Sequence, residues 1–165
     1  MMKDDVGGTL PRARRVLILG YGNPGRRDDG LGPALAQRVQ EADLPGVRVE
    51  SGYQLNIEDA AAVAQHELVV FADASRGSEP PFVLRPLEPR TGAMEFTTHS
   101  ASPEGILGLA HDVFGAETEG FSLAIRGYDF DGFGEGLSDN AELNLNAAVE
   151  FLRTSLNREP RITPK

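Results

Sequence analysis

The sequence predicts an α/β domain of the three-layer sandwich type, with helices on both faces of a twisted, mainly parallel sheet of about five strands. Two short, continuous apolar runs, at residues 16–19 and 68–72, are bounded by turn residues. Such runs are typical of strands that are buried on both faces. Segments with apolar residues at helical spacing alternate with the strand candidates, which favours parallel pairing through helical crossovers. The 165 residues suit a single domain, which we expect to span residues 15–156.

The first half of the chain opens with R-V-L-I-L-G-Y-G-N-P-G-R-R-D-D-G-L-G at residues 15–32, a strand followed by a loop and the start of a helix. The elements expected there are, in order, a strand at residues 16–19, a helix from 31 to about 42, a short strand at 47–51, a helix at 57–65 and a strand at 68–72. The strand at 68–72 is closed by Asp73, so two strands deliver carboxylates at their ends. In an open α/β sheet, ligands bind at this edge.

The second half starts with a strand at residues 82–87, which we expect at an edge of the sheet because prolines flank it. Ser102 and Pro103 indicate the N-cap and first position of a helix that ends near Phe114. The remaining elements expected are an ordered loop at 90–102, a strand at 121–126 and an amphipathic helix at 139–156. Residues 127–138 place aromatic and acidic residues among glycines, so they form either a mobile loop over a site or a wide connection.

The two ends of the chain are expected to lie outside the packed domain. Residues 1–14 carry charges but no apolar h-region, which indicates a disordered extension and not a secretory signal. Residues 157–165 are expected to form a flexible tail. No apolar run approaches the roughly 20 residues that cross a membrane, so we expect no membrane partner. Without cysteine there is no disulfide and no thiolate ligand or nucleophile, and a cytoplasmic monomer is the default expectation.

The charge of the chain argues against a nucleic-acid partner. The formal net charge is −9, and residues 51–165 hold eight Lys and Arg against eighteen Asp and Glu. A polyanion would be repelled by most of such a surface.

Three residues at or near the expected carboxyl edge form a candidate metal site: Asp29 (or its neighbour Asp28), Asp73 and His99. Two carboxylates and one imidazole are suitable donors for a divalent cation. Because these donors leave coordination positions open, the set suits docking or catalysis better than a structural site.

Each of these residues also has an ordinary structural explanation. The first carboxylate can interact with the positive end of the following helix, Asp73 can begin a turn, and His99 can be a hydrogen-bonded loop residue. His66 and His111 are assigned to a helix end and a helix surface. The prediction of a site therefore depends on the three residues being grouped at one edge.

The glycines at residues 20–25 match G-x-G-x-x-G, and Glu50 lies near the place of a ribose-binding acid, so a dinucleotide-binding fold is an alternative. Two features oppose it. Pro24 removes one backbone N–H from the would-be phosphate cradle, and Asp28 and Asp29 place negative charge near the pyrophosphate.

Residues 16–32 resemble the amino-terminal signature of the hydrogenase maturation endopeptidases, which open with G-x-G-N, a four-residue spacer, Asp followed by Glu or Asp, and a nearby glycine. In this family, a strand-ending A-D and a later loop histidine complete a nickel-binding trio. The matching positions are Asp29, Asp73 in F-A-D-A-S and His99 in T-T-H-S. The resemblance covers residues 15–156 and implies a twisted sheet between helices.

The resemblance implies an endopeptidase that removes a C-terminal extension from the nickel-loaded precursor of a nickel-iron hydrogenase large subunit. Nickel carried by the precursor would serve as the recognition element, and other divalent cations suit the same donors. No catalytic nucleophile is evident, which leaves open a metal-dependent docking or chaperone module that grips this subunit without cutting it. Residues 52–55 and 127–136 are expected to help select the partner. Many members have an acidic residue before a glycine pair after the second strand, where this chain has E-S-G-Y at 50–53.

The stretch G-Y-G-N-P-G also resembles the G-L-G-N-P-G opening of peptidyl-tRNA hydrolases. Those proteins need a histidine and an asparagine shortly afterwards, where this chain has Arg26, Arg27, Asp28 and Asp29. They also bind tRNA, which the acidic surface opposes.

Overall fold

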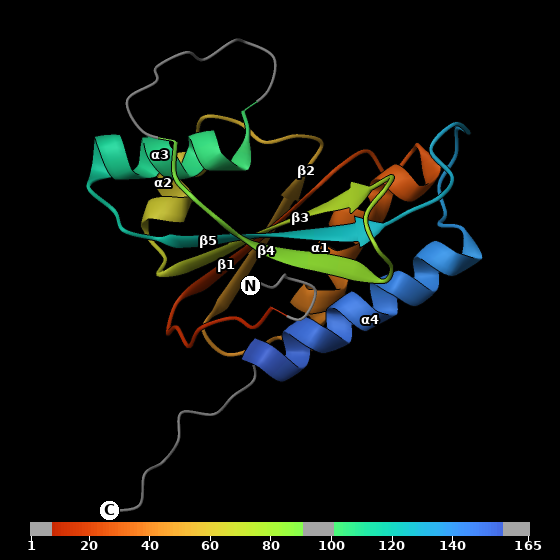
Figure 1. Cartoon of the computed structure of the whole chain (residues 1–165), viewed down its shortest axis with the longest axis horizontal. Coiled ribbons are helices and arrows are strands. Elements are labelled where there is room, and N and C mark those ends of the chain that lie inside the picture. The colour runs from red at the N-terminus through yellow and green to blue at the C-terminus, as the bar shows by residue number, and fades with distance from the viewer. Residues whose placement is uncertain (1–7, 91–100, 157–165) are drawn as a thin grey trace, which may run out of the picture.

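The structure, a computed structural model, describes residues 8–90 and 101–156 (Figure 1). Its elements are, in chain order, β1 (Val16–Tyr21), the 3-10 helix η1 (Arg27–Gly30), α1 (Leu31–Ala42), β2 (Val47–Gly52), α2 (Asp59–Ala64), β3 (Leu68–Ser75), β4 (Phe82–Leu87), α3 (Pro103–Phe114), β5 (Glu119–Arg126) and α4 (Asp139–Leu156). Nearly every element was predicted within a few residues of these bounds. The exception is η1, which lies inside the expected loop.

The strands form one sheet in the order β2-β1-β3-β5-β4. Adjacent strands are parallel except at β4, which runs antiparallel to β5 at one edge. The predicted fold class is therefore confirmed, as is the edge position of the proline-flanked strand. Pro86 is tolerated within β4 because an edge strand has one side without a ladder partner.

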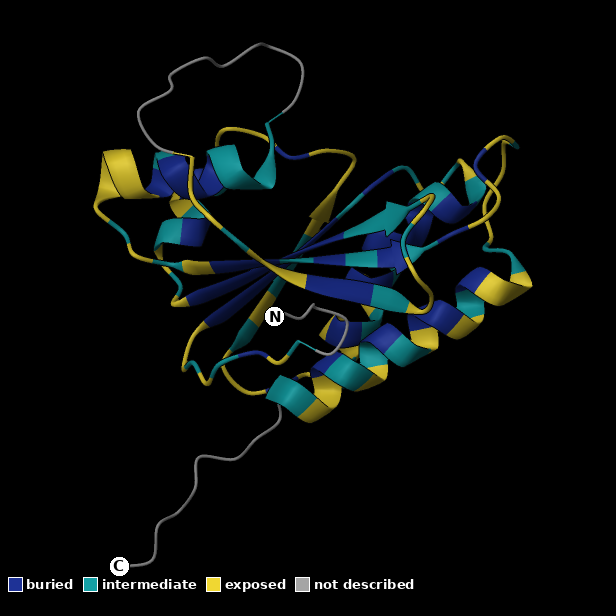
Figure 2. Ribbon diagram, viewed as in Figure 1, coloured by how far each residue is buried: buried dark blue, intermediate teal, exposed yellow. Residues whose placement is uncertain are grey.

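Helices cover both faces of the sheet, α1 and α4 on one and α2 and α3 on the other (Figure 1). Successive residues of β3 point to opposite faces, so Val70 packs with the first pair of helices and Phe71 with the second. The central strands are buried along most of their length, as the dark blue ribbon shows (Figure 2). This explains why their sequences read as continuous apolar runs and not as alternating ones.

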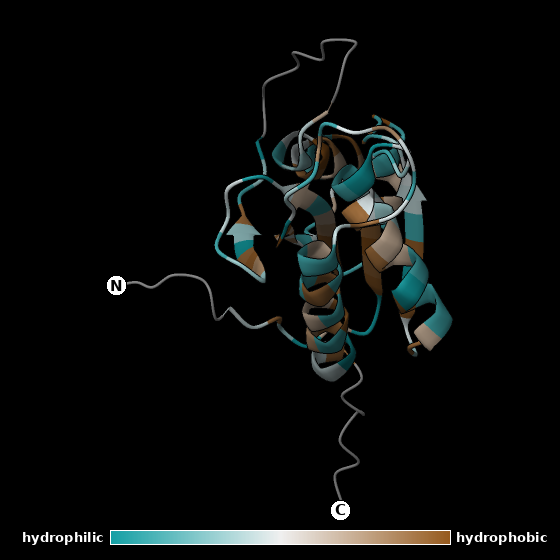
Figure 3. Cartoon of the chain, turned by 90° about the vertical axis from the view of Figure 1, so that its right-hand side faces the viewer, coloured by the Kyte–Doolittle hydropathy of each residue, from teal (hydrophilic) through white to brown (hydrophobic). Residues whose placement is uncertain are grey.

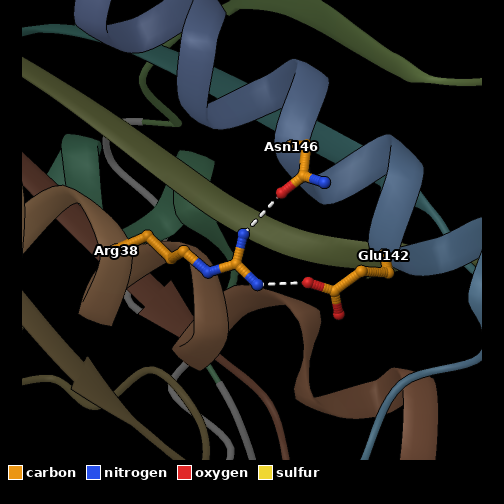
Figure 4. A network of polar contacts seen from close by, with 3 residues as sticks. All are labelled: Arg38, Glu142 and Asn146. Carbon is orange, nitrogen blue, oxygen red and sulfur yellow. Dashed lines mark hydrogen bonds and ion pairs between the residues drawn. The ribbon is translucent and has the colours of Figure 1, made fainter.

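Helix α4 is amphipathic, and apolar and polar segments alternate along it (Figure 3). Leu145, Ala148 and Leu152 are buried against the sheet. On the outer side, the Arg38 guanidinium of α1 forms an ion pair with Glu142 and donates a hydrogen bond to Oδ1 of Asn146 (2.6 Å), which joins the two helices (Figure 4). None of the helices in the described ranges has the length and apolar content to cross a membrane.

Two predicted boundaries are wrong. β3 continues past the apolar run to Ser75, because β5 runs beside it and pairs Asp73 with Ala124. Asp73 therefore lies inside a strand and not after it. Leu10, expected in a disordered extension, is only 4% exposed and belongs to the core under α1 and α4. The packed unit thus includes residues before Arg15, while the termini at 1–7 and 157–165 lie outside the described residues.

Candidate functional site

The site lies where β1 and β3 end side by side at the carboxyl edge of the sheet. Parallel pairing brings Gly20 level with Ala72, so the chain that leaves β1 passes next to Asp73. Helix α1 starts close above this point: a Cβ at Gly32 would lie 2.3 Å from the Tyr21 carbonyl oxygen and 2.7 Å from that of Ala72. A glycine is required there, and it lets the loop before α1 fold back over the strand ends.

The Asp29 carboxylate is held in this loop by one hydrogen bond, which the backbone N–H of Asn23 donates to its Oδ2 (2.8 Å). The backbone around it is tight. Gly22 has a φ of 147°, and a Cβ there would lie 2.1 Å from the carbonyl oxygen of Asp29. Asp29 is half-buried, so its side chain is fixed by local structure while part of it stays accessible.

Asp73 is half-buried in β3, and its Oδ1 accepts a hydrogen bond from the backbone N–H of Ala74 (2.7 Å). Burial raises the pKa of the Asp73 carboxyl to about 6; the Ala74 hydrogen bond opposes this shift, and the negative charge of Asp29 adds to it. The structure thus brings Asp29 and Asp73 close enough to interact electrostatically. Two neighbouring carboxylates that are partly buried lose hydration and also repel each other. A divalent cation between such groups offsets both the lost hydration and the repulsion.

Tyr21 and Glu104 also belong to this edge, and sequence reasoning missed both. Burial, and after it the charges of Asp73 and Glu104, raise the pKa of the Tyr21 hydroxyl above its usual range. The hydroxyl therefore stays protonated and is a hydrogen-bond donor beside two carboxylates. The signal was present in part, because Tyr21 is the last residue of the strand that leads to Asp29. Nothing in the sequence brought Glu104, in the first turn of α3, to the same place.

Asp28 has a different role from its neighbour. Its side chain is fully buried and accepts four hydrogen bonds from the loop at residues 127–138. The donors are the backbone N–H groups of Tyr128 (2.7 Å), Asp129 (2.8 Å) and Ser138 (2.8 Å) and the Ser138 hydroxyl (2.7 Å). Burial acts to raise the pKa of Asp28, but these hydrogen bonds outweigh it and lower the pKa below its usual value. Asp28 anchors a loop, which leaves Asp29 as the carboxylate beside Asp73.

The third predicted ligand, His99, lies outside the described residues. Among residues 8–90 and 101–156, no group of three or more His, Cys, Asp or Glu side chains is arranged to hold a metal ion. His66 and His111 lie on other parts of the fold, as predicted. The ring of His66 contacts the Ala62 carbonyl at the end of α2 (2.7 Å), and His111 is exposed on α3.

The glycine-rich loop after β1 does not form a phosphate cradle. Its backbone N–H groups are already used: Gly22 donates to the Gly52 carbonyl (3.0 Å), Asn23 to Asp29, and Gly25 to the Asn23 side chain (2.9 Å). Dinucleotide-binding loops need these groups free for the pyrophosphate. The structure therefore speaks against the dinucleotide-binding alternative.

A small pocket of about 60 Å³ lies beside the site, between the ends of β1 and β2. Its lining includes Tyr21, Glu50, Asn56 and Asp59. The Asp59 carboxylate accepts a hydrogen bond from the Asn56 backbone N–H (2.8 Å), while Glu50 is paired with Arg48 (2.7 Å). The pocket widens the edge next to Tyr21.

Comparison with known proteins identifies the fold. No protein-family model and no curated protein sequence matches the chain. Among solved structures, it is similar to the [NiFe] hydrogenase maturation protease HycI from Thermococcus kodakarensis, with a TM-score of 0.70, 22% identity and coverage of 88% of this chain and 94% of that one. It is also similar to a hydrogenase 2 maturation peptidase from Thaumarchaeota archaeon SCGC_AB-539-E09 (0.62, 23%, 85% and 96%) and to the hydrogenase maturating endopeptidase HybD from E. coli (0.60, 22%, 86% and 93%). At these identities the likeness establishes a shared fold.

Proposed function

We propose that this chain, which shares the fold of hydrogenase maturation proteases, is itself an endopeptidase of hydrogenase maturation. It removes a C-terminal extension from the precursor of a nickel-iron hydrogenase large subunit. The observation that carries the proposal is the interacting pair of Asp29 and Asp73 at the carboxyl edge of this fold. The same two positions match the motifs of the family in the sequence, so fold and motif support one assignment.

The proposed recognition element is nickel that the precursor already carries. Asp29, Asp73 and His99 are its proposed ligands, two carboxylates and an imidazole, which suit a divalent ion and leave positions for groups of the precursor. An empty precursor would leave the two carboxylates facing each other without a cation. A loaded precursor neutralises them, so the difference in contacts discriminates between the two.

The proposed chemistry is metal-assisted hydrolysis. A divalent ion at the scissile bond polarises its carbonyl or activates a water molecule. Within the proposal, the protonated Tyr21 hydroxyl donates a hydrogen bond toward the peptide at this edge. Within the proposal the attacking group is a water molecule, and the chain has no cysteine that could take its place.

The test is incubation of the wild-type chain with nickel-loaded, full-length large-subunit precursor, followed by mass spectrometry of the C-terminus. We expect loss of one short peptide. His99→Ala is expected to abolish this cleavage, and His111→Ala, on an exposed histidine of α3, to leave it unchanged. Nickel-dependent binding without cleavage would support the docking module in place of the enzyme. Cleavage by His99→Ala at the wild-type rate would remove that histidine from the site.

A further inference from the structure

The loop at residues 127–138 exposes aromatic side chains next to the site. Phe133 is 78% exposed, the highest value among the exposed large hydrophobic residues of the described chain, and Tyr128 is 42% exposed. The loop follows β5, so it leaves the same carboxyl edge of the sheet as Asp29 and Asp73 (Figure 1). An apolar ring in water costs free energy unless another surface covers it.

This loop is fastened to the segment that carries Asp29. Asp28 accepts four hydrogen bonds from it, as described above. Gly134 pairs with the same segment through its backbone: its N–H donates to the Gly25 carbonyl (2.7 Å), and its carbonyl accepts from the Arg27 N–H (3.1 Å). Gly134 has a φ of 127°, which a residue with a side chain adopts only under strain. These hydrogen bonds therefore fix the position of the loop relative to the segment that carries Asp29.

Phe133 itself is oriented by a contact. The Arg26 guanidinium lies 5.4 Å from the centre of its ring, and Nη2 of the same group donates to the Phe130 carbonyl (3.4 Å). Phe130 is buried, with the Arg76 guanidinium 4.3 Å from its ring. An exposed aromatic residue that is already positioned loses little conformational freedom on binding, which is a property of interface hot spots.

The surroundings of Phe133 indicate the chemistry of the partner. Asp129, Asp131 and Glu135 are exposed in the same loop, and the chain as a whole carries a net charge of −9. A complementary surface has an apolar pocket for the ring, with basic side chains opposite these carboxylates and an acidic side chain opposite the Arg26 guanidinium that lies over the ring.

We propose that the 127–138 loop is a docking surface for the precursor protein and that Phe133 is its anchor. The proposal rests on the proposed function, since it takes the large-subunit precursor as the partner. It assigns to this loop the part of binding that does not depend on nickel, while Asp29 and Asp73 supply the nickel-dependent part. Because residues 26–28 fasten the loop and Asp29 follows directly, docking through Phe133 presents the precursor to the site in one orientation.

The test measures the affinity of metal-free, full-length precursor for the wild type, Phe133→Ala and the control Phe114→Ala. Phe114 is a matched control because it is also an exposed phenylalanine, with 54% of its surface accessible, and it lies at the C-terminal end of α3. We expect Phe133→Ala to bind roughly tenfold more weakly and Phe114→Ala to bind as the wild type does. Phe133→Ala should also raise the concentration of loaded precursor that gives half-maximal cleavage by a similar factor, since its defect is in binding.

The outcomes separate the two proposals. Equal affinity of Phe133→Ala and wild type, with normal cleavage by the wild type, would overturn the docking surface and leave the endopeptidase. Binding that depends on Phe133, without cleavage of loaded precursor by the wild type, would overturn the endopeptidase and leave the docking surface. Absence of both binding and cleavage by the wild type would overturn both.

Discussion

The regions around Asp28 and Asp73 lie at the same edge of the sheet, yet they shift the pKa of a carboxylate in opposite directions. Asp28 is fully buried and receives four hydrogen bonds, so its pKa is lowered. Asp73 receives one hydrogen bond, from the N–H of the next residue, and burial, with the charge of Asp29 added to it, raises its pKa to about 6. The first region is complete within the protein. The carboxylates around Asp73 would be stabilised by a positive charge, which is the property expected of a binding site.

The comparison predicts its largest effect in activity. Asp29→Asn and Asp73→Asn keep the shape of the side chain but remove the negative charge to which the proposal assigns cation binding. We expect each to slow cleavage of nickel-loaded precursor by about 1000-fold, on the scale of losing a group at the reacting centre. The rates are measured by mass spectrometry against Asp43→Asn, a change at the far end of α1. Either variant retaining full activity would remove its residue from the site.

The next effect is on stability, and it belongs to Asp28. Asp28→Ala leaves the buried donors of the 127–138 loop without an acceptor, which we expect to lower the free energy of unfolding by roughly 3 kcal/mol. Asp131→Ala, in the exposed part of the same loop, should change it by less than about 0.5 kcal/mol. Urea denaturation of both variants is the measurement. Equal stability of the two would show that the Asp28 hydrogen bonds do not hold the loop.

A smaller effect concerns Asp73 and pH. Its folded-state pKa of about 6 lies above its ordinary value of 3.8, so the folded protein binds this proton more readily than the unfolded chain. The resulting stabilisation is present below pH 3.8 and is lost as the pH rises through about 6. Relative to wild type, the stability of Asp73→Asn should therefore increase as the pH rises from 3.8 through about 6, by about 1 kcal/mol because solvent screens a half-buried group. A loss of stability of Asp73→Asn relative to wild type over this pH range would contradict the raised pKa.

The smallest effect is expected away from the edge, where Arg38 joins α1 to α4. The side chains of Arg38 and Glu142 are 37% and 44% exposed. Exposed ion pairs add little, so Arg38→Ala should lower the free energy of unfolding by less than about 1 kcal/mol and leave processing unchanged. Denaturation and the cleavage assay check both statements. A loss comparable to that of Asp28→Ala would mean that the helix pair matters as much as the loop anchor.

The fold was predictable because its signals are local. Apolar runs, helical spacing, the Ser102 cap and the proline-flanked edge strand each identify an element within a few residues of sequence. The errors arise where a distant partner decides. β3 extends through Asp73 because β5 pairs with it, and Leu10 is ordered because a core assembled elsewhere accepts its side chain.

The site was predictable only in part for the same reason. Asp28 and Asp29 are equivalent in sequence, and what separates them is a loop at least 100 residues away along the chain, whose residues Tyr128, Asp129 and Ser138 donate hydrogen bonds to Asp28 alone. Tyr21 and Glu104 are distant in sequence, and only the folded chain brings the Glu104 charge near enough to act on the Tyr21 hydroxyl. Asp29 and Asp73 could be grouped from the sequence because each was expected at or near the carboxyl end of a strand in a mainly parallel sheet, and the two strands are neighbours in the structure. The assignment of His99 stays a prediction, because it lies outside the described residues.

The central claim of the proposal is that Asp29 and Asp73 recognise nickel carried by the precursor. It is tested most directly by the ratio of two initial rates, cleavage of nickel-loaded and of metal-free precursor by the wild-type chain at equal concentrations. We predict cleavage of the loaded form and none of the metal-free form. Cleavage of both forms at the same rate would contradict the claim, because the carboxylate pair would then have no part in choosing the substrate.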